Sequence, residues 1–150
     1  MNTVTVNAMD ITLPDWSDSL RAFVTKTLDS INKNNWDLSV LLCSDRAIKE
    51  LNTQYRNKAE TTDVLSFRQD TEFSDEGGLR YLPGDIVISL DTLRENSKIY
   101  KISEDEELRR LLIHGILHLD GMDHVSNNDT EPMIVLQEEI LKKLNGEHIL

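Results

Sequence analysis

Residues 114–124 read His-Gly-Ile-Leu-His-Leu-Asp-Gly-Met-Asp-His and contain three of the four histidines in the chain. His114 and His118 are four residues apart, so a helix would place both imidazoles on one face, about 5.4 Å apart along its axis. Gly121 follows where a helix would end, because glycine readily adopts the left-handed conformation needed there. A turn at Gly121 would bring His124 back to the same point. The spacing predicts three ligands for one zinc ion, with a fourth position open to water, as in catalytic zinc sites.

The alternative is that two histidines four residues apart arise by accident on an amphipathic helix. A third histidine beyond a glycine at the helix end makes an accident a poor explanation, and we therefore favour a metal site.

The segment before the motif carries the signals of a long helix. Ser103, followed by Glu106 three residues later, forms a capping box. Apolar side chains lie almost all round the segment, at Leu108, Leu111, Leu112, Ile116, Leu117 and Leu119. A helix that is apolar on nearly every side is expected to be central and buried, so it would hold its histidines rigidly.

Elsewhere the hydrophobic periodicity predicts strands over residues 4–6, 38–43, 61–67 and 85–89, and helices over 15–31, 45–54, 91–100 and 131–144. Residues 69–80 are acidic and include Gly77-Gly78, which predicts an exposed loop. Leu82-Pro83-Gly84 predicts a turn before the fourth strand. A length of 150 residues predicts one domain, residues 1–150.

The composition is that of an ordinary globular protein, with a net charge of −11. Such a charge argues against bulk electrostatic attraction to nucleic acid, although a local basic patch would still be compatible with it. We find no apolar run long enough to span a membrane and no secretory signal pattern. Cys43 is the only cysteine and lies in an apolar run, so we expect a core residue in a cytoplasmic protein.

The histidine spacing is that of the metzincin metalloproteases, whose pattern is H-E-x-x-H-x-x-G-x-x-H. The glutamate of that pattern is the general base of the protease, and Gly115 stands in its place. Peptide hydrolysis is therefore disfavoured. Asp123 is a candidate substitute base, but a carboxylate there would equally suit orienting a histidine or capping the loop.

Arg56 lies in a polar segment before a predicted strand, and a guanidinium suits bidentate binding of a phosphate. Arg56 and Lys58 together would grip a phosphodiester near the metal. The alternative is that both are ordinary exposed residues, and the sequence pattern by itself favours that alternative.

Four blocks of the sequence resemble the YbeY family of bacterial rRNA maturation factors. Residues 114–124 resemble its motif H-G-x-L-H-L-x-G-[YH]-D-H, and residues 84–89 resemble G-D-I-x-I-S. Residues 52–56 and 62–67 are similar to N-x-x-Y-R and T-D-V-L-S-F, in the same order. Met122 departs from the usual aromatic or histidine, at a position that is not a ligand. The resemblance covers nearly the whole chain.

This resemblance implies an α+β single domain with a mixed β-sheet packed with helices and a zincin-like metal site on a central buried helix. It implies one Zn²⁺ per chain, held by His114, His118 and His124, and a functional role for Arg56. It also implies a single-strand-specific endoribonuclease acting in rRNA processing, including maturation of the 16S rRNA 3′ end, and in ribosome quality control. The implied partners are ribosomal RNA, ribosomal proteins and an assembly GTPase, with no membrane. A non-catalytic ribosome-assembly factor with a fold-organising zinc is the alternative, and a metalloprotease the least favoured.

Overall fold

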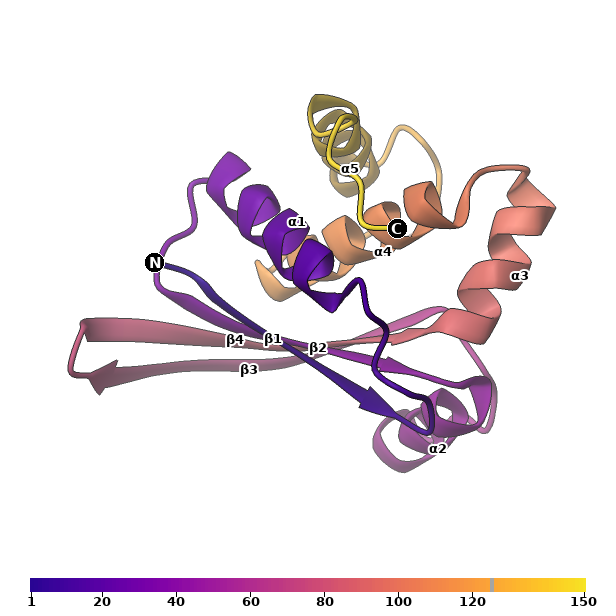
Figure 1. The fold of residues 1–150 in the computed structure, drawn as a ribbon, viewed down its shortest axis with the longest axis horizontal. Helices are drawn as coiled ribbons and strands as arrows, with labels where there is room; N and C mark the ends of the chain where they lie inside the picture. Colours follow the sequence, from indigo (N-terminus) through magenta and orange to yellow (C-terminus); the bar gives the residue numbers. More distant parts are fainter. Residues whose placement is uncertain (125) are drawn as a thin grey trace.

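A four-stranded mixed sheet forms the centre of the computed structural model, which describes residues 1–124 and 126–150. Its strands are β1 (Thr3–Met9), β2 (Trp36–Cys43), β3 (Val64–Asp75) and β4 (Gly78–Ser89), in the spatial order β1-β2-β4-β3. β2 pairs in parallel with both β1 and β4, whereas β3 and β4 form an antiparallel hairpin. The hairpin extends beyond the rest of the sheet (Figure 1).

Five helices cover the sheet: α1 (Ser17–Ser30), α2 (Asp45–Arg56), α3 (Leu90–Tyr100), α4 (Glu104–Leu119) and α5 (Pro132–Lys143). Figure 1 shows α1, α3, α4 and α5 on one side of the sheet and α2 on the other. Among the helices described, none combines the length and the apolar character needed to cross a membrane.

Alternate residues of the strands divide the core into two clusters, because successive side chains of a strand point to opposite faces. The larger cluster joins one face of β1, β2 and β4 to α1, α4 and α5. The smaller one lies beneath α2 and contains Cys43, Ala47, Ile48, Leu65 and Val87. Helix α4 contacts α1, α3, α5, β3 and β4, which confirms that it is central and buried. The α+β class with a mixed sheet is likewise confirmed.

Cys43 is completely buried, and its thiol donates to the backbone oxygen of Ile88 at 3.6 Å. Burial raises the pKa of this thiol to about 12, so the nucleophilic thiolate is disfavoured. The role of Cys43 as a core residue is confirmed.

The exposed loop predicted for residues 69–80 is wrong. β3 continues to Asp75 and β4 already begins at Gly78, so these residues form most of a hairpin. Nearly all side chains in this part of β3 are exposed, and strand signals that depend on apolar alternation are therefore missing. The hairpin turn is Glu76–Gly77, and Gly78, which pairs with Asp75 at the start of β4, has a φ of +110°.

The turn predicted at Leu82-Pro83-Gly84 is also wrong, since these residues lie within β4, between two neighbouring strands. Proline cannot donate to a ladder and is normally excluded from central strands. Both pairings of β4 are irregular at this point: the register with β2 shifts between Trp36 and Leu38, and the register with β3 shifts between Arg68 and Thr71. The missing N–H therefore falls where regular pairing is interrupted.

Candidate metal centre

Three imidazoles converge at the C-terminal end of α4. His114 and His118 lie on α4, and a turn at Gly121 with a φ of +95° leads to His124. The Gly121 N–H donates to the oxygen of His118 and the Met122 N–H to that of Leu117, both at 3.0 Å, which is a Schellman motif. One nitrogen from each histidine lies within 4.8 Å of the others. The predicted convergence of the three rings is confirmed.

Each ring uses its Nδ1 in a hydrogen bond pointing away from the cluster. The partners are Gln137 Oε1 for His114 at 2.7 Å, the Met122 oxygen for His118 at 3.1 Å, and the Ser126 oxygen for His124 at 2.7 Å. All three partners are carbonyl oxygens, which only accept hydrogen bonds, so each Nδ1 carries the proton. Each Nε2 is therefore left with a lone pair, the form in which imidazole binds metal.

The Nε2 atoms of His114 and His118 lie 3.1 Å apart. With both protons on Nδ1, two lone pairs face each other across this gap, and no hydrogen bond joins them. A cation shared between the rings removes this repulsion. The donor set of three neutral imidazoles also suits zinc, so the residues present fit the predicted ion.

Burial lowers the pKa of His114 and of His118. Hydrogen bonding to Gln137 and to the Met122 oxygen opposes this effect without overcoming it. Both rings are therefore neutral at physiological pH and available to a metal.

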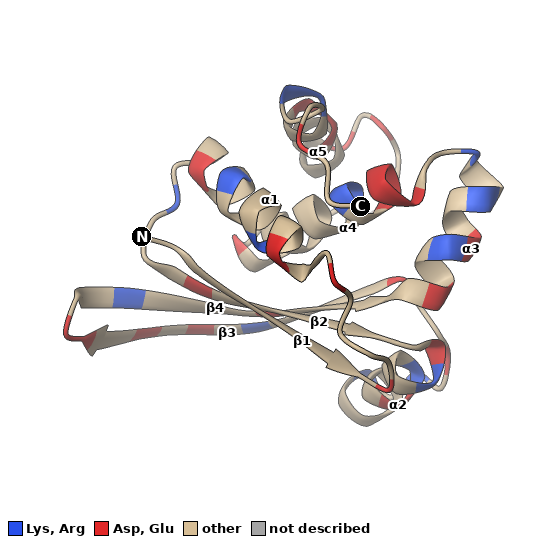
Figure 2. Cartoon of the chain, in the orientation of Figure 1, with Lys and Arg blue, Asp and Glu red and all other residues tan. Residues whose placement is uncertain are grey.

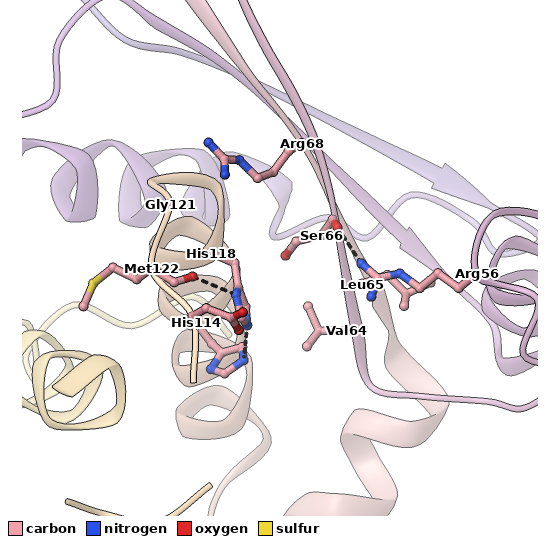
Figure 3. Close-up of a pocket in the computed structure, with 10 residues that line it drawn as sticks. Arg56, Val64, Leu65, Ser66, Arg68, His114, His118, Gly121 and Met122 are labelled. Atoms are coloured by element: carbon pink, nitrogen blue, oxygen red, sulfur yellow. Dashed lines mark hydrogen bonds between the residues drawn. The ribbon is translucent and has the colours of Figure 1, made fainter. Parts of the chain in front are cut away.

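A cavity of about 370 Å³ opens beside His114 and His118. Its other lining residues are Arg56, Val64, Leu65, Ser66, Arg68, Gly121, Met122 and Asp123. Figure 3 shows the histidines facing β3 across this space, with the side chains of Arg56 and Arg68 on different sides of Ser66. We call this space the histidine pocket.

Arg56 is the last residue of α2, so the helix extends two residues further than the periodicity predicted. Its guanidinium donates to the Ser66 oxygen at 2.8 Å and lies 5.6 Å from the Phe67 ring centre. The structure thus brings Arg56 to the histidine pocket, from a segment more than fifty residues away. Lys58 is exposed and does not line the pocket.

Gly115 faces the sheet and not the histidine pocket. A Cβ at this position would lie 3.0 Å from three side-chain carbons of Ile86 on β4. A glutamate at this position would therefore collide with the core before it could act as a base. The absence of the protease glutamate follows from the packing of α4 on β4.

Asp123 lines the histidine pocket, and its Oδ1 accepts the backbone N–H of His124 at 2.8 Å. This hydrogen bond matches the loop-capping alternative. The carboxylate is exposed and lies near His118, so the alternative that it serves as a substitute base stays open.

Sequence reasoning missed three residues of the site: Gln137, Ser66 and Arg68. Gln137 is 5% exposed, and its amide nitrogen donates to Glu138 Oε2 at 3.0 Å, which orients its oxygen towards His114. An amide between Met133 and Ile140 on the apolar face of a helix was the available signal. Ser66 and Arg68 gave no such signal, because only the pairing of β3 turns them towards the histidines.

The family model described as "Endoribonuclease YbeY" matches residues 3–145. A Treponema pallidum protein named Endoribonuclease YbeY is 46% identical over 142 residues, covering 94% of this chain and 89% of its own length. The proteins of the same name from Treponema denticola and Borreliella burgdorferi are 47% and 42% identical, covering 85% and 81% of this chain and 83% and 82% of their own lengths.

Among solved structures, the solution structure of TM1509 from Thermotoga maritima is similar, with a TM-score of 0.61 and 27% identity. The match covers 97% of this chain and 91% of that one. The two chains therefore share the fold over nearly their whole length.

Proposed function

This chain belongs to the YbeY endoribonuclease family, and on that premise we propose that it is a zinc-dependent endoribonuclease acting on single-stranded ribosomal RNA. The observation that carries the proposal is the convergence of three unprotonated Nε2 atoms beside an arginine in an open pocket. Such a site offers a metal ligand set and a phosphate-binding group at one place.

We assign the ligands as His114, His118 and His124, and one Zn²⁺ to each chain. A bound zinc would supply an acidified water and neutralise charge developing on a phosphoryl oxygen. Gln137 and the two backbone oxygens hold the rings in the ligating tautomer. Arg56 would bind a phosphoryl oxygen of the scissile phosphodiester and stabilise the charge that grows on it. Asp123 would accept or return a proton at its carboxylate.

We further propose that the protein matures the 16S rRNA 3′ end and takes part in ribosome quality control in the cytoplasm. This cellular role rests on the resemblance of the motifs. With a net charge of −11, the protein would gain little from long-range attraction to RNA. Ribosomal proteins and an assembly GTPase would therefore bring it to its substrate, and their binding would replace electrostatic steering.

The test is cleavage of a single-stranded fragment from the 3′ end of 16S rRNA, with the same sequence annealed into a duplex as the comparison. The zinc-loaded protein is expected to cut the single strand, and a chelator should stop cleavage until zinc is restored. His114→Ala should reduce the rate at least a hundredfold, because the metal loses a ligand and the pocket its cation.

His148→Ala is the matched control. This fourth histidine contacts Asp105 Oδ2 at 3.0 Å, away from the metal centre, so its loss should leave cleavage unchanged. Equal cleavage by the His114→Ala protein would show that the activity comes from a contaminant or from another site.

A non-catalytic assembly factor remains the second candidate, and one observation favours it. His124 lies outside α4, so a shared ion would tie the loop after Gly121 to the central helix and organise this part of the fold. Under that alternative, a folded variant lacking cleavage activity, such as Arg56→Ala, would still restore rRNA processing in cells lacking the protein.

A metalloprotease is the least favoured candidate, because Gly115 faces Ile86 and offers no base. The wild-type protein is expected to leave a casein-like substrate intact.

A further inference from the structure

The eight arginines of this chain differ sharply in their partners. Six form ion pairs with carboxylates: Arg21, Arg46, Arg80, Arg94, Arg109 and Arg110. Within residues 1–124 and 126–150, Arg56 and Arg68 form none. These two are also the arginines that line the histidine pocket.

This distribution is unexpected for an acidic protein. The chain has 27 acidic residues and 16 basic ones, so a carboxylate is available to most guanidiniums. Figure 2 shows acidic and basic residues interspersed along the helices and the β3–β4 hairpin. Asp70 lies only two residues after Arg68, yet its carboxylate accepts the Tyr81 hydroxyl at 2.6 Å. Two guanidiniums without carboxylate partners at one pocket indicate a site for an anion.

The backbone directs Arg68 to this pocket. Val64, Ser66 and Arg68 occupy alternate positions of β3 and all line it, as residues on one face of a strand should. The register of the hairpin shifts directly after Arg68, and Asp70 there has a φ of +48°. On β4, Gly84 has a φ of +141°, and a Cβ there would lie 1.9 Å from the Phe67 oxygen. The bulge therefore ends the regular face at Arg68.

The strand sets the backbone spacing between Arg68 and Ser66, the residue that Arg56 contacts. Arg56 donates to the Ser66 oxygen, and Arg68 follows Ser66 by two residues, about 7 Å along the strand. In Figure 3 the Arg68 side chain extends above the end of α4 near Gly121, while Arg56 lies beyond Ser66. The two guanidiniums therefore reach the histidine pocket from different sides of Ser66.

We propose that Arg68 forms a second phosphate subsite, which binds a backbone phosphate next to the one held at Arg56 and the metal. The inference rests on the proposed function for its ligand, a single RNA strand. Arg68 is a binding and positioning residue, since it holds the strand and not the reacting phosphorus. The strand would run along β3, past the histidines, with one phosphate at each guanidinium.

The experiment measures binding of a fluorescent single-stranded oligoribonucleotide by the zinc-loaded protein at several salt concentrations. Arg68→Ala is expected to weaken binding about tenfold, as loss of one charge-assisted contact would. It should also make the slope of log affinity against log salt shallower by about 0.7, the value for one lost phosphate contact to a single strand. Arg68→Lys keeps the charge and should keep the slope.

Arg46→Ala is the matched control. Arg46 lies at the start of α2, outside the histidine pocket, where it is exposed and paired with Asp10. Its replacement removes the same single positive charge. It should leave both affinity and slope at the wild-type values. If both alanine variants changed affinity and slope equally, the cause would be the loss of net charge, and the proposed subsite would be wrong.

Cleavage assays on the same proteins separate this inference from the proposed function. If the wild type binds and cleaves RNA but Arg68→Ala leaves the salt slope unchanged, the subsite is wrong and the proposed nuclease function stands. Binding that depends on Arg68 without any cleavage would support the subsite and contradict the nuclease assignment. Failure of the wild type to bind RNA would overturn both. Where cleavage occurs, Arg68→Ala should raise KM more than it lowers kcat.

Discussion

At the scale of single residues, Gln137 determines how His114 presents its lone pair. Gln137 Oε1 lies 2.7 Å from His114 Nδ1, and the side chain is buried. Gln137→Met keeps the length of the side chain and removes the acceptor, so the tautomer and the ring orientation are no longer held. We expect zinc affinity to fall by about 10- to 100-fold, the usual effect of losing such a partner. Competition with a chromophoric chelator would measure it.

Gln137→Glu is the control for this prediction, since a carboxylate still accepts from Nδ1. It should bind zinc at least as well as the wild type. An unchanged zinc affinity in Gln137→Met would mean that the ring is held by packing alone.

At the scale of elements, the close approach of α4 to β4 depends on Gly115. Gly115→Ala gains about 1 kcal/mol of helix propensity but places a methyl 3.0 Å from three carbons of the stiff Ile86 side chain. Overpacking of this kind costs about 1–3 kcal/mol, so we expect a net loss of about 1 kcal/mol in the free energy of unfolding. Urea denaturation would measure it.

A double-mutant cycle with Ile86→Val tests the cause, because the smaller side chain should relieve part of the strain and make the two changes non-additive. Gly146→Ala is the matched control, since a Cβ there meets nothing within 4 Å. Full additivity of the changes at 115 and 86 would argue that the contact is not the source of the loss.

At the scale of the whole molecule, hydrogen bonds to Asp105 link the C-terminal residues to the start of α4. Its carboxylate accepts from the backbone N–H groups of Ile149 and Leu150, at 2.7 and 3.0 Å, and from Arg109 at 2.9 Å. Burial favours the neutral acid, but these hydrogen bonds, with one to His148, outweigh it and lower the pKa of Asp105. A lowered folded-state pKa contributes stability above the unfolded value and loses it as pH falls through the folded one.

Asp105→Asn should therefore lower the free energy of unfolding by about 2 kcal/mol at pH 7, the scale of hydrogen bonds to a charged group. The difference from wild type should shrink below about pH 4, where the carboxylate of the unfolded state takes up its proton, and should be lost once the native carboxylate is protonated at lower pH. Asp18→Asn is the control, because its carboxylate is almost fully exposed and its pair with Arg21 contributes little. Urea titrations at several pH values would test this, and a difference that grows in acid would contradict it.

Strand and helix positions were predictable wherever one face of an element is apolar. The first helix, α3 and α5 agree with the periodicity to within about two residues at each end, as do the core parts of β2 and β4. The β3–β4 hairpin was missed because its outer half is exposed on both faces and carries no period. Its pairing depends on hydrogen bonds between backbones, which side-chain patterns do not record.

The sequence alone determined what is local. The spacing of His114 and His118, the positive φ at Gly121, and the Ser103 cap, whose hydroxyl accepts the Glu106 N–H at 3.0 Å, all follow from a few adjacent residues. These interactions span at most one or two helical turns, so residue type and spacing suffice to predict them.

The tertiary structure decided what surrounds the three imidazoles. Packing of α5 on α4 supplies Gln137, and the pairing of β3 with β4 brings Ser66 and Arg68 opposite the histidines. The contact with Ile86 explains why position 115 is glycine. Each of these contacts joins residues more than fifteen positions apart in the chain. Only the folding of the sheet and helices around a common core brings them together, which is why no spacing in the sequence reveals them.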